Sequence, residues 1–114
     1  MPGLTVVDIK SDMPTCEVAN KRARSAINNA KTLGYSAIKI IHGYGSHGKG
    51  GKIRISLRSL LAELESAGKI LAFIPGESFS IFDEATRNAF MRCPELRRDS
   101  DLEASNNGIS IIIL

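Results

Sequence analysis

The spacing of apolar residues changes several times along the chain, and each change marks an expected element. Apolar residues recur at helical spacing from about Thr15 to Leu33 and from about Lys52 to Ala67, and a glycine follows each stretch. Short apolar runs typical of strands occupy residues 4–9, 37–41, 71–74 and 109–114. A further helix is expected over residues 83–93, where Pro94 ends it. The resulting order, β-α-β-α-β-(α)-β, predicts a two-layer or three-layer α/β domain with right-handed crossovers.

Residues 76–107 are the least regular part of the chain. From Glu95 to Asn107 the segment is charged and rich in turn-forming residues, so we expect an exposed excursion there. Its apolar side chains either contact a partner or form a small satellite core beneath a long loop, and they are Phe79, Ile81, Phe82, Phe90 and Met91. The apolar run that follows must be buried, and we therefore expect it to complete the sheet.

Length and composition limit the chain to one domain, residues 1–114. At 114 residues and 43% hydrophobic, the chain is long enough for a single core but too short for a dinucleotide fold with two halves. The net charge of +3 is compatible with a nucleic-acid partner. Cys16 and Cys93 lack CxxC spacing, which favours reduced thiols in a cytoplasmic protein. With no signal peptide before the first strand and no apolar run near the ~20 residues of a membrane span, we expect no membrane association.

The loop between the second expected strand and the second expected helix concentrates the chemistry of the chain. Residues 42–52 include five glycines, both histidines and two lysines. Glycines let backbone N–H groups turn toward a ligand, and the start of a helix adds unpaired N–H groups and a partial positive charge. Lys49, Lys52 and Arg54 extend that charge, while His42 and His47 titrate near neutral pH. The loop therefore predicts a polyanion site that binds or cleaves phosphodiesters.

The same loop matches two nucleotide-binding patterns only in part. Residues 43–48 read GxGxxG, but the acidic residue needed about twenty positions later falls inside the second expected helix. Residues 43–49 read GxxxxGK, but Gly50 replaces the hydroxyl that would bind magnesium. We therefore expect neither a dinucleotide nor a nucleoside triphosphate, and no metal or cofactor.

Two short motifs at the ends of the first two expected strands have a familiar layout. The first strand ends in Val7-Asp8-Ile9-Lys10, and the second ends in Ile40-Ile41-His42-Gly43-Tyr44-Gly45. In motif, spacing and order they resemble the L-D-x-H and I-I-H-G-x-G motifs of the Smr (small MutS-related) domain family. The similarity covers about Thr5 to Ile74 and resumes over the last strand. Residues 76–107 are an irregular insertion that the minimal domain lacks.

The resemblance implies a four-stranded mixed sheet similar to the C-terminal domain of translation initiation factor 3. It also implies binding or endonucleolytic cleavage of RNA or DNA, in several members at ribosomes. Asp8 and His42 would be the catalytic pair, with His42 as general acid or base and Asp8 orienting it. Both follow strands, where open α/β sheets bind ligands, and they could face each other if the strands are parallel neighbours. Nucleic acid would contact Lys10, Gly43, Tyr44, Gly45, Ser46, His47, Gly48, Lys49, Gly50, Lys52 and Arg54.

Departures from the family pattern leave alternatives open. Lys10 replaces the histidine of the first motif and keeps its charge, but a lysine does not shuttle protons near pH 7 unless its pKa falls strongly, so we expect binding over turnover. His47 either substitutes as an acid or lies in solvent. Asp8 is either catalytic, a helix cap or the partner of Lys10, and His42 is either catalytic or a packed residue bonded to the backbone.

A competing hypothesis comes from a different functional class. The domain would be a non-catalytic interaction module whose loop holds an acidic protein surface or a phosphate ligand, with residues 76–107 as the docking element. The cations Lys21, Arg22 and Arg24 are interpreted as a solvated helix face, and Tyr44 is the aromatic residue placed to stack on a base.

Overall fold

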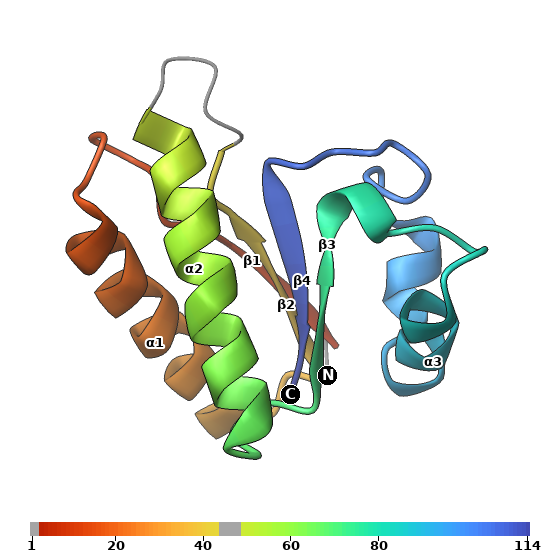
Figure 1. Ribbon diagram of the computed structural model, residues 1–114. Helices are drawn as coiled ribbons and strands as arrows, with labels where there is room; N and C mark the ends of the chain where they lie inside the picture. The colour runs from red at the N-terminus through yellow and green to blue at the C-terminus, as the bar shows by residue number, and fades with distance from the viewer. Residues whose placement is uncertain (1–2, 44–48) are drawn as a thin grey trace.

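The strands are β1 (Leu4–Asp8), β2 (Ala37–Ile41), β3 (Ala72–Pro75) and β4 (Ile109–Ile113). They form one mixed sheet in the order β1-β2-β4-β3, within a computed structural model that describes residues 3–43 and 49–114 (Figure 1). β1 and β2 are parallel, and β4 runs antiparallel to both β2 and β3. The predicted element order and the single α/β domain are confirmed, and β4 completes the sheet as expected.

Helices cover both faces of this sheet (Figure 1). One face packs against α1 (Cys16–Thr32) and α2 (Lys49–Ser66), and the other against α3 (Glu84–Arg92), so the domain has three layers. Short 3-10 turns at Gly76–Ser78 and Pro94–Arg98 flank α3. Among residues 3–43 and 49–114, no helix combines the length and the apolarity needed to cross a membrane.

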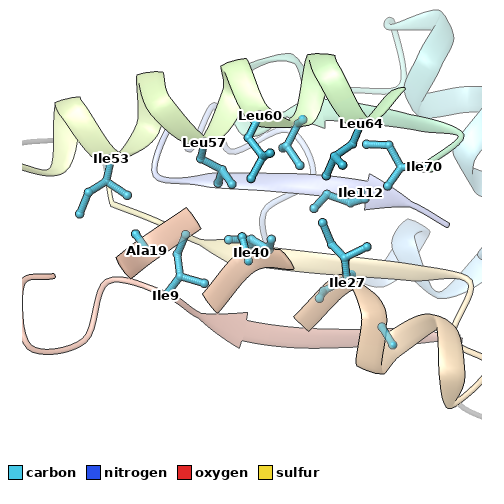
Figure 2. Close-up of a cluster of buried hydrophobic side chains, with 14 residues drawn as sticks. Ile9, Ala19, Ile27, Ile40, Ile53, Leu57, Leu60, Leu64, Ile70 and Ile112 are labelled. Atoms are coloured by element: carbon cyan, nitrogen blue, oxygen red, sulfur yellow. The ribbon is translucent and has the colours of Figure 1, made fainter. Parts of the chain in front are cut away.

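The first core layer lies between the sheet and the pair α1–α2 (Figure 2). The buried face of α1 is mostly alanine with Ile27, and small side chains let this helix approach its neighbours closely. From α2, Leu57 and Leu61 insert with no exposed surface against Ile40 and Ile112 of the central strands. The helical spacing of apolar residues thus indicated the buried face of α2 correctly, whereas Leu33, at the end of the first helical stretch, is exposed.

The second core layer corrects the interpretation of residues 76–107. Residues 95–107 were expected to form an exposed excursion, and the apolar side chains of residues 76–107 either a partner contact or a satellite core. Phe79, Phe90 and Leu96 are instead buried in one cluster with Ile111 and Ile113 of β4, because the sheet has a second apolar face that this segment covers. Of the five apolar residues singled out from the sequence, the other three are exposed, namely Ile81, Phe82 and Met91.

Ion pairs with a buried lysine hold residues 76–107 against the sheet. The ammonium of Lys39, the only polar side chain of β2, lies 2.7 Å from a carboxylate oxygen of Asp101 and 3.0 Å from one of Asp99. Asn106 donates a further hydrogen bond to Asp101. The charges and turns that suggested solvent exposure instead hold the chain against the sheet.

Candidate functional site

The carboxyl ends of β1 and β2 lie together at one edge of the sheet. The two strands are parallel neighbours, with Asp8 opposite Ile41, and the amide of Ile9 continues the ladder by donating to the Ile41 carbonyl. The chain leaves β2 through His42 and Gly43, whose amides both donate to the carbonyl of Gly108. The expectation that the two strands are parallel neighbours is confirmed, and the segment before β4 bonds to the backbone where β2 ends.

The side chain of His42 is fully buried and has a partner at each ring nitrogen. Nδ1 lies 2.8 Å from the carbonyl oxygen of Gly43, and Nε2 lies 3.0 Å from the hydroxyl oxygen of Ser110. Because a carbonyl can only accept, Nδ1 carries the proton of the neutral ring, and Nε2 accepts from the Ser110 hydroxyl. The Nε of Arg58 donates in turn to that hydroxyl oxygen, at 3.4 Å. Both ring nitrogens are thus occupied within the protein.

Burial and nearby cations keep His42 neutral. Loss of hydration is the main cause that lowers the pKa of His42, and the positive charges of Arg58 and Arg54 lower it further. The bond to Gly43 acts in the opposite direction and is outweighed. Arg58 is held by two 2.7 Å bonds to the carboxylate of Glu77, and these bonds lower the pKa of Glu77.

We expect the free energy of unfolding to fall on acidification below pH 6.5, through His42. The pKa is lowered from 6.5 only in the folded state, so between the two pKa values the unfolded chain binds more protons, and stability rises with pH by at most about 1.4 kcal/mol per unit. Urea unfolding from pH 5.5 to 7.5 measures this slope. The slope of the free energy of unfolding against pH should become smaller in His42→Gln and persist in the matched control His47→Gln. An equal slope in both variants would refute the assignment of this pH dependence to His42.

Asp8 and His42 lie on opposite faces of the sheet. Side chains alternate along a strand, and His42 falls on the face of Ile40 and Ser110, toward α2, whereas Asp8 falls on the face of Ile41. Adjacent parallel strands therefore do not bring the two side chains face to face. Asp8 accepts a 2.7 Å bond from the Lys10 amide, and its carboxylate lies 3.6 Å from the Lys10 ammonium.

These contacts agree with the structural alternatives for both residues. Asp8 pairs with Lys10, and Thr15 rather than Asp8 caps α1 by accepting from the amide of Val18. His42 is a packed strand-end residue bonded to the backbone of Gly43. At this edge the side chains of Lys10 and its partner Asp8 are exposed, whereas that of His42 is not.

Three cations surround the strand ends. Lys10 lies beside Gly43, whose added Cβ would stand 3.3 Å from the Lys10 side chain, and the positive φ of Gly43 already favours glycine. Lys52 lies against the loop that joins β1 to α1, where it lines a small pocket of about 210 Å³ with residues 13–16. Arg54 is close enough to lower the pKa of His42. Segments from β1, β2 and α2 thus meet around one cationic edge.

The start of α2 differs from the prediction. The helix begins at Lys49, not at about Lys52, so Gly50 and Gly51 belong to its first turn. The pattern missed this turn because glycine costs about 1 kcal/mol relative to alanine in a helix. The first turn contains two lysines and no acid, so nothing in it offsets the partial positive charge of a helix start. The remaining predicted contacts lie outside the described residues, namely Tyr44, Gly45, Ser46, His47 and Gly48.

Sequence reasoning missed the polar partners of His42. Ser110 is the single polar residue in the last apolar run, and that isolation was the available signal. Arg58 and Glu77 are far apart in sequence, and nothing local indicates their pairing. Both cysteines are free. Within the described ranges, no three His, Cys, Asp or Glu side chains are grouped to hold a metal ion.

Comparison of the chain with protein-family models, curated proteins and solved structures gave no match.

Proposed function

We propose that this is an Smr-like domain that binds the phosphate backbone of RNA or DNA at the carboxyl ends of β1 and β2. The observation that carries the proposal is the presence of three cations near the strand ends, beside a helix start that contains no acid. Lys10 lies beside Gly43, Lys52 lies against residues 13–16, and Arg54 is close enough to His42 to lower its pKa. Cations, glycine backbone and helix N–H groups together suit phosphate oxygens. The element order and the mixed sheet support a fold similar to the C-terminal domain of translation initiation factor 3, and we extend the proposal to a cytoplasmic, ribosome-associated partner.

Within this proposal the domain binds without cleaving. A general base must reach the proton that it removes, whereas His42 is fully buried with both ring nitrogens engaged. Asp8, its supposed orienting partner, falls on the other face of the sheet and pairs with Lys10. The geometry thus favours a structural role for the residues of the motif, with the cations as the groups that bind phosphate.

Fluorescence anisotropy with labelled single-stranded RNA, single-stranded DNA and duplex DNA tests the binding. We expect the triple variant Lys10→Gln, Lys52→Gln, Arg54→Gln to bind at least about tenfold more weakly, and the slope of log affinity against log salt to fall by about two to three. The matched control carries the same charge change away from the edge, as Lys69→Gln, Arg92→Gln, Arg98→Gln, and should keep most of its affinity. Equal losses in both variants would refute the site.

A cleavage assay tests the second half of the proposal. Labelled RNA and supercoiled DNA are incubated with the protein, with and without divalent metal, beside His42→Ala and Lys10→His. We expect intact substrates with the unmodified protein. Cleavage that disappears in His42→Ala would overturn the binding-only assignment, whereas cleavage gained only in Lys10→His would support it. Binding that survives both high salt and the triple variant would favour the competing interaction module.

A further inference from the structure

β1 is an edge strand with one side open. In the described part of the chain β1 pairs only with β2. The Gly3 carbonyl accepts from the Ala37 amide and the Ile9 amide donates to Ile41, so the odd-numbered residues of β1 face β2. The backbone groups of Leu4, Val6 and Asp8 therefore alternate outward. An open row of this kind is a template for another strand.

The open row is bounded at both ends. The carboxylate of Glu95 accepts from the amides of Gly3 and Leu4, and the guanidinium of Arg22 donates to the carbonyls of Ile9 and Ser11. Between these ends the open edge presents the N–H and C=O of Val6, together with the neighbouring outward backbone groups of Leu4 and Asp8. This window matches the five or so residues of an ordinary strand.

A groove runs beside this edge, between β1 and α1. It encloses about 550 Å³ and is lined by Thr5 and Val7 from the strand, and by apolar side chains that include Val18, Ala26 and Leu33. A strand laid along β1 would direct every second side chain into this groove. The groove therefore adds side-chain selection to backbone pairing, which is the arrangement of β-strand addition between a sheet edge and a helix.

Charge differs between the two ends of the groove. Arg22 reaches the carbonyl of Ile9, so Lys21 and Arg22 belong to the end near the carboxyl terminus of β1. Asp8 lines the same end but pairs with Lys10, and Lys21 lies 3.7 Å from Glu17 of its own helix. Leu33 and Tyr35, after the end of α1, belong to the other end, where β1 begins. The partner that fits carries apolar side chains at alternate positions and a carboxylate at the Lys21–Arg22 end.

We propose that the β1 edge and this groove bind an extended segment of a partner polypeptide, which joins the sheet as a fifth strand and places a carboxylate against Lys21 and Arg22. A second copy of the chain fits less well. Antiparallel pairing of two β1 strands would place Asp8 of one copy near Leu4 of the other, away from the cationic end. That carboxylate already pairs with Lys10. The site adjoins the cationic edge at Gly43, because Asp8 lines the groove and pairs with Lys10, but the proposal does not depend on nucleic-acid binding.

A displayed library of random eight-residue peptides, panned on the intact protein, identifies the probe. The enriched peptides are then synthesised with a fluorescent label and titrated by anisotropy. Val6→Pro removes the outward amide of Val6 without removing a bond to β2, and we expect it to weaken peptide binding about tenfold or more. The matched control Val6→Thr keeps the amide and should bind within about twofold. Lys21→Gln should weaken binding about threefold.

Amide hydrogen exchange on the unmodified protein gives a second readout that does not depend on the folding of a variant. Bound peptide should slow exchange of the outward amides of Val6 and Asp8. The proposal is overturned if no peptide is enriched, if enriched peptides bind Val6→Pro as tightly as Val6→Thr, or if exchange at Val6 does not change. Protection of Val6 that rises with protein concentration without peptide, together with dimers in sedimentation, would overturn it in favour of a second copy.

Discussion

Replacing Lys39 with alanine is expected to lower the free energy of unfolding by about 3–5 kcal/mol, because it leaves two carboxylates buried without their cation. The side chains of Lys39, Asp99 and Asp101 are only 10%, 8% and 18% exposed. All three polar contacts of the ammonium are between 2.7 and 3.1 Å. Removing only the cation from a charge cluster this buried therefore costs much free energy.

Urea unfolding at pH 7, followed by circular dichroism, measures the loss. The triple variant Lys39→Met, Asp99→Asn, Asp101→Asn removes cation and anions together, and we expect it to recover most of the lost stability because no uncompensated charge remains. The exposed Lys52→Ala is the matched lysine control and should change stability by less than about 0.5 kcal/mol. A loss below about 1 kcal/mol in Lys39→Ala would show that the cluster contributes little.

The stability that this charge cluster contributes falls at both low and high pH. Burial alone would lower the pKa of Lys39, but hydrogen bonds and charges from Asp101 and Asp99 outweigh burial and raise it above 10.5. Burial likewise opposes the bonds from Asn106 and Lys39 that lower the pKa of Asp101 below 3.8. The contribution of the cluster is therefore complete between about pH 4 and 10.5, and is lost as pH falls or rises beyond that range.

The Lys39 cluster also connects the second core layer to the cationic edge. Asp99 and Asp101 hold the chain that leads to Gly108, and the Gly108 carbonyl accepts from the amides of His42 and Gly43. Two residues later, Ser110 donates to the His42 ring. Residues 76–107, interpreted from sequence as an insertion, thus position the strand end on which the proposed phosphate site depends.

Local pattern predicted the elements well where local chemistry decides them. The β-branched run of β2 was placed at residues 37–41, where the structure has it, and Thr15 begins α1 as its cap. The predictions failed where contacts between residues far apart in the sequence determine the structure. The pairing of Lys39 with Asp99 spans sixty positions, and no local signal indicates it. Charged residues between 95 and 107 therefore suggested solvent, although Asp99 and Asp101 among them pair with Lys39 of the sheet.

The expectation that Asp8 and His42 could face each other was wrong for a related reason. Parallel adjacency of β1 and β2 was a correct expectation, but register determines which side chains share a face. With Asp8 opposite Ile41, His42 is one position out of step and falls on the other face. Register is a tertiary property that a single sequence does not specify. The prediction of cations near the strand ends did not depend on register, because lysine and arginine side chains there reach solvent from either face.

Gly76→Ala is expected to destabilise the fold by about 3 kcal/mol, through overpacking at the junction between β3 and the second core layer. A Cβ at Gly76 would collide with the backbone carbonyl oxygen of Asn106 and stand 2.7 Å from both the carbonyl oxygen and the side chain of Ile109. Gly76 itself is buried, and two of these atoms belong to backbone that cannot rotate away. The strain falls on residues 106–109, next to the carbonyl that holds His42 and Gly43.

Gly51→Ala is the matched control, since nothing lies within 4 Å of its added Cβ and the residue is inside α2. Alanine there should raise stability by about 0.5–1 kcal/mol, because glycine loses more backbone freedom in a helix. Urea unfolding of both variants measures the contrast, and amide exchange at His42 and Gly43 should accelerate in Gly76→Ala alone. Equal stabilities would mean that residues 106–109 yield easily, and the cationic edge would then not depend on their close packing.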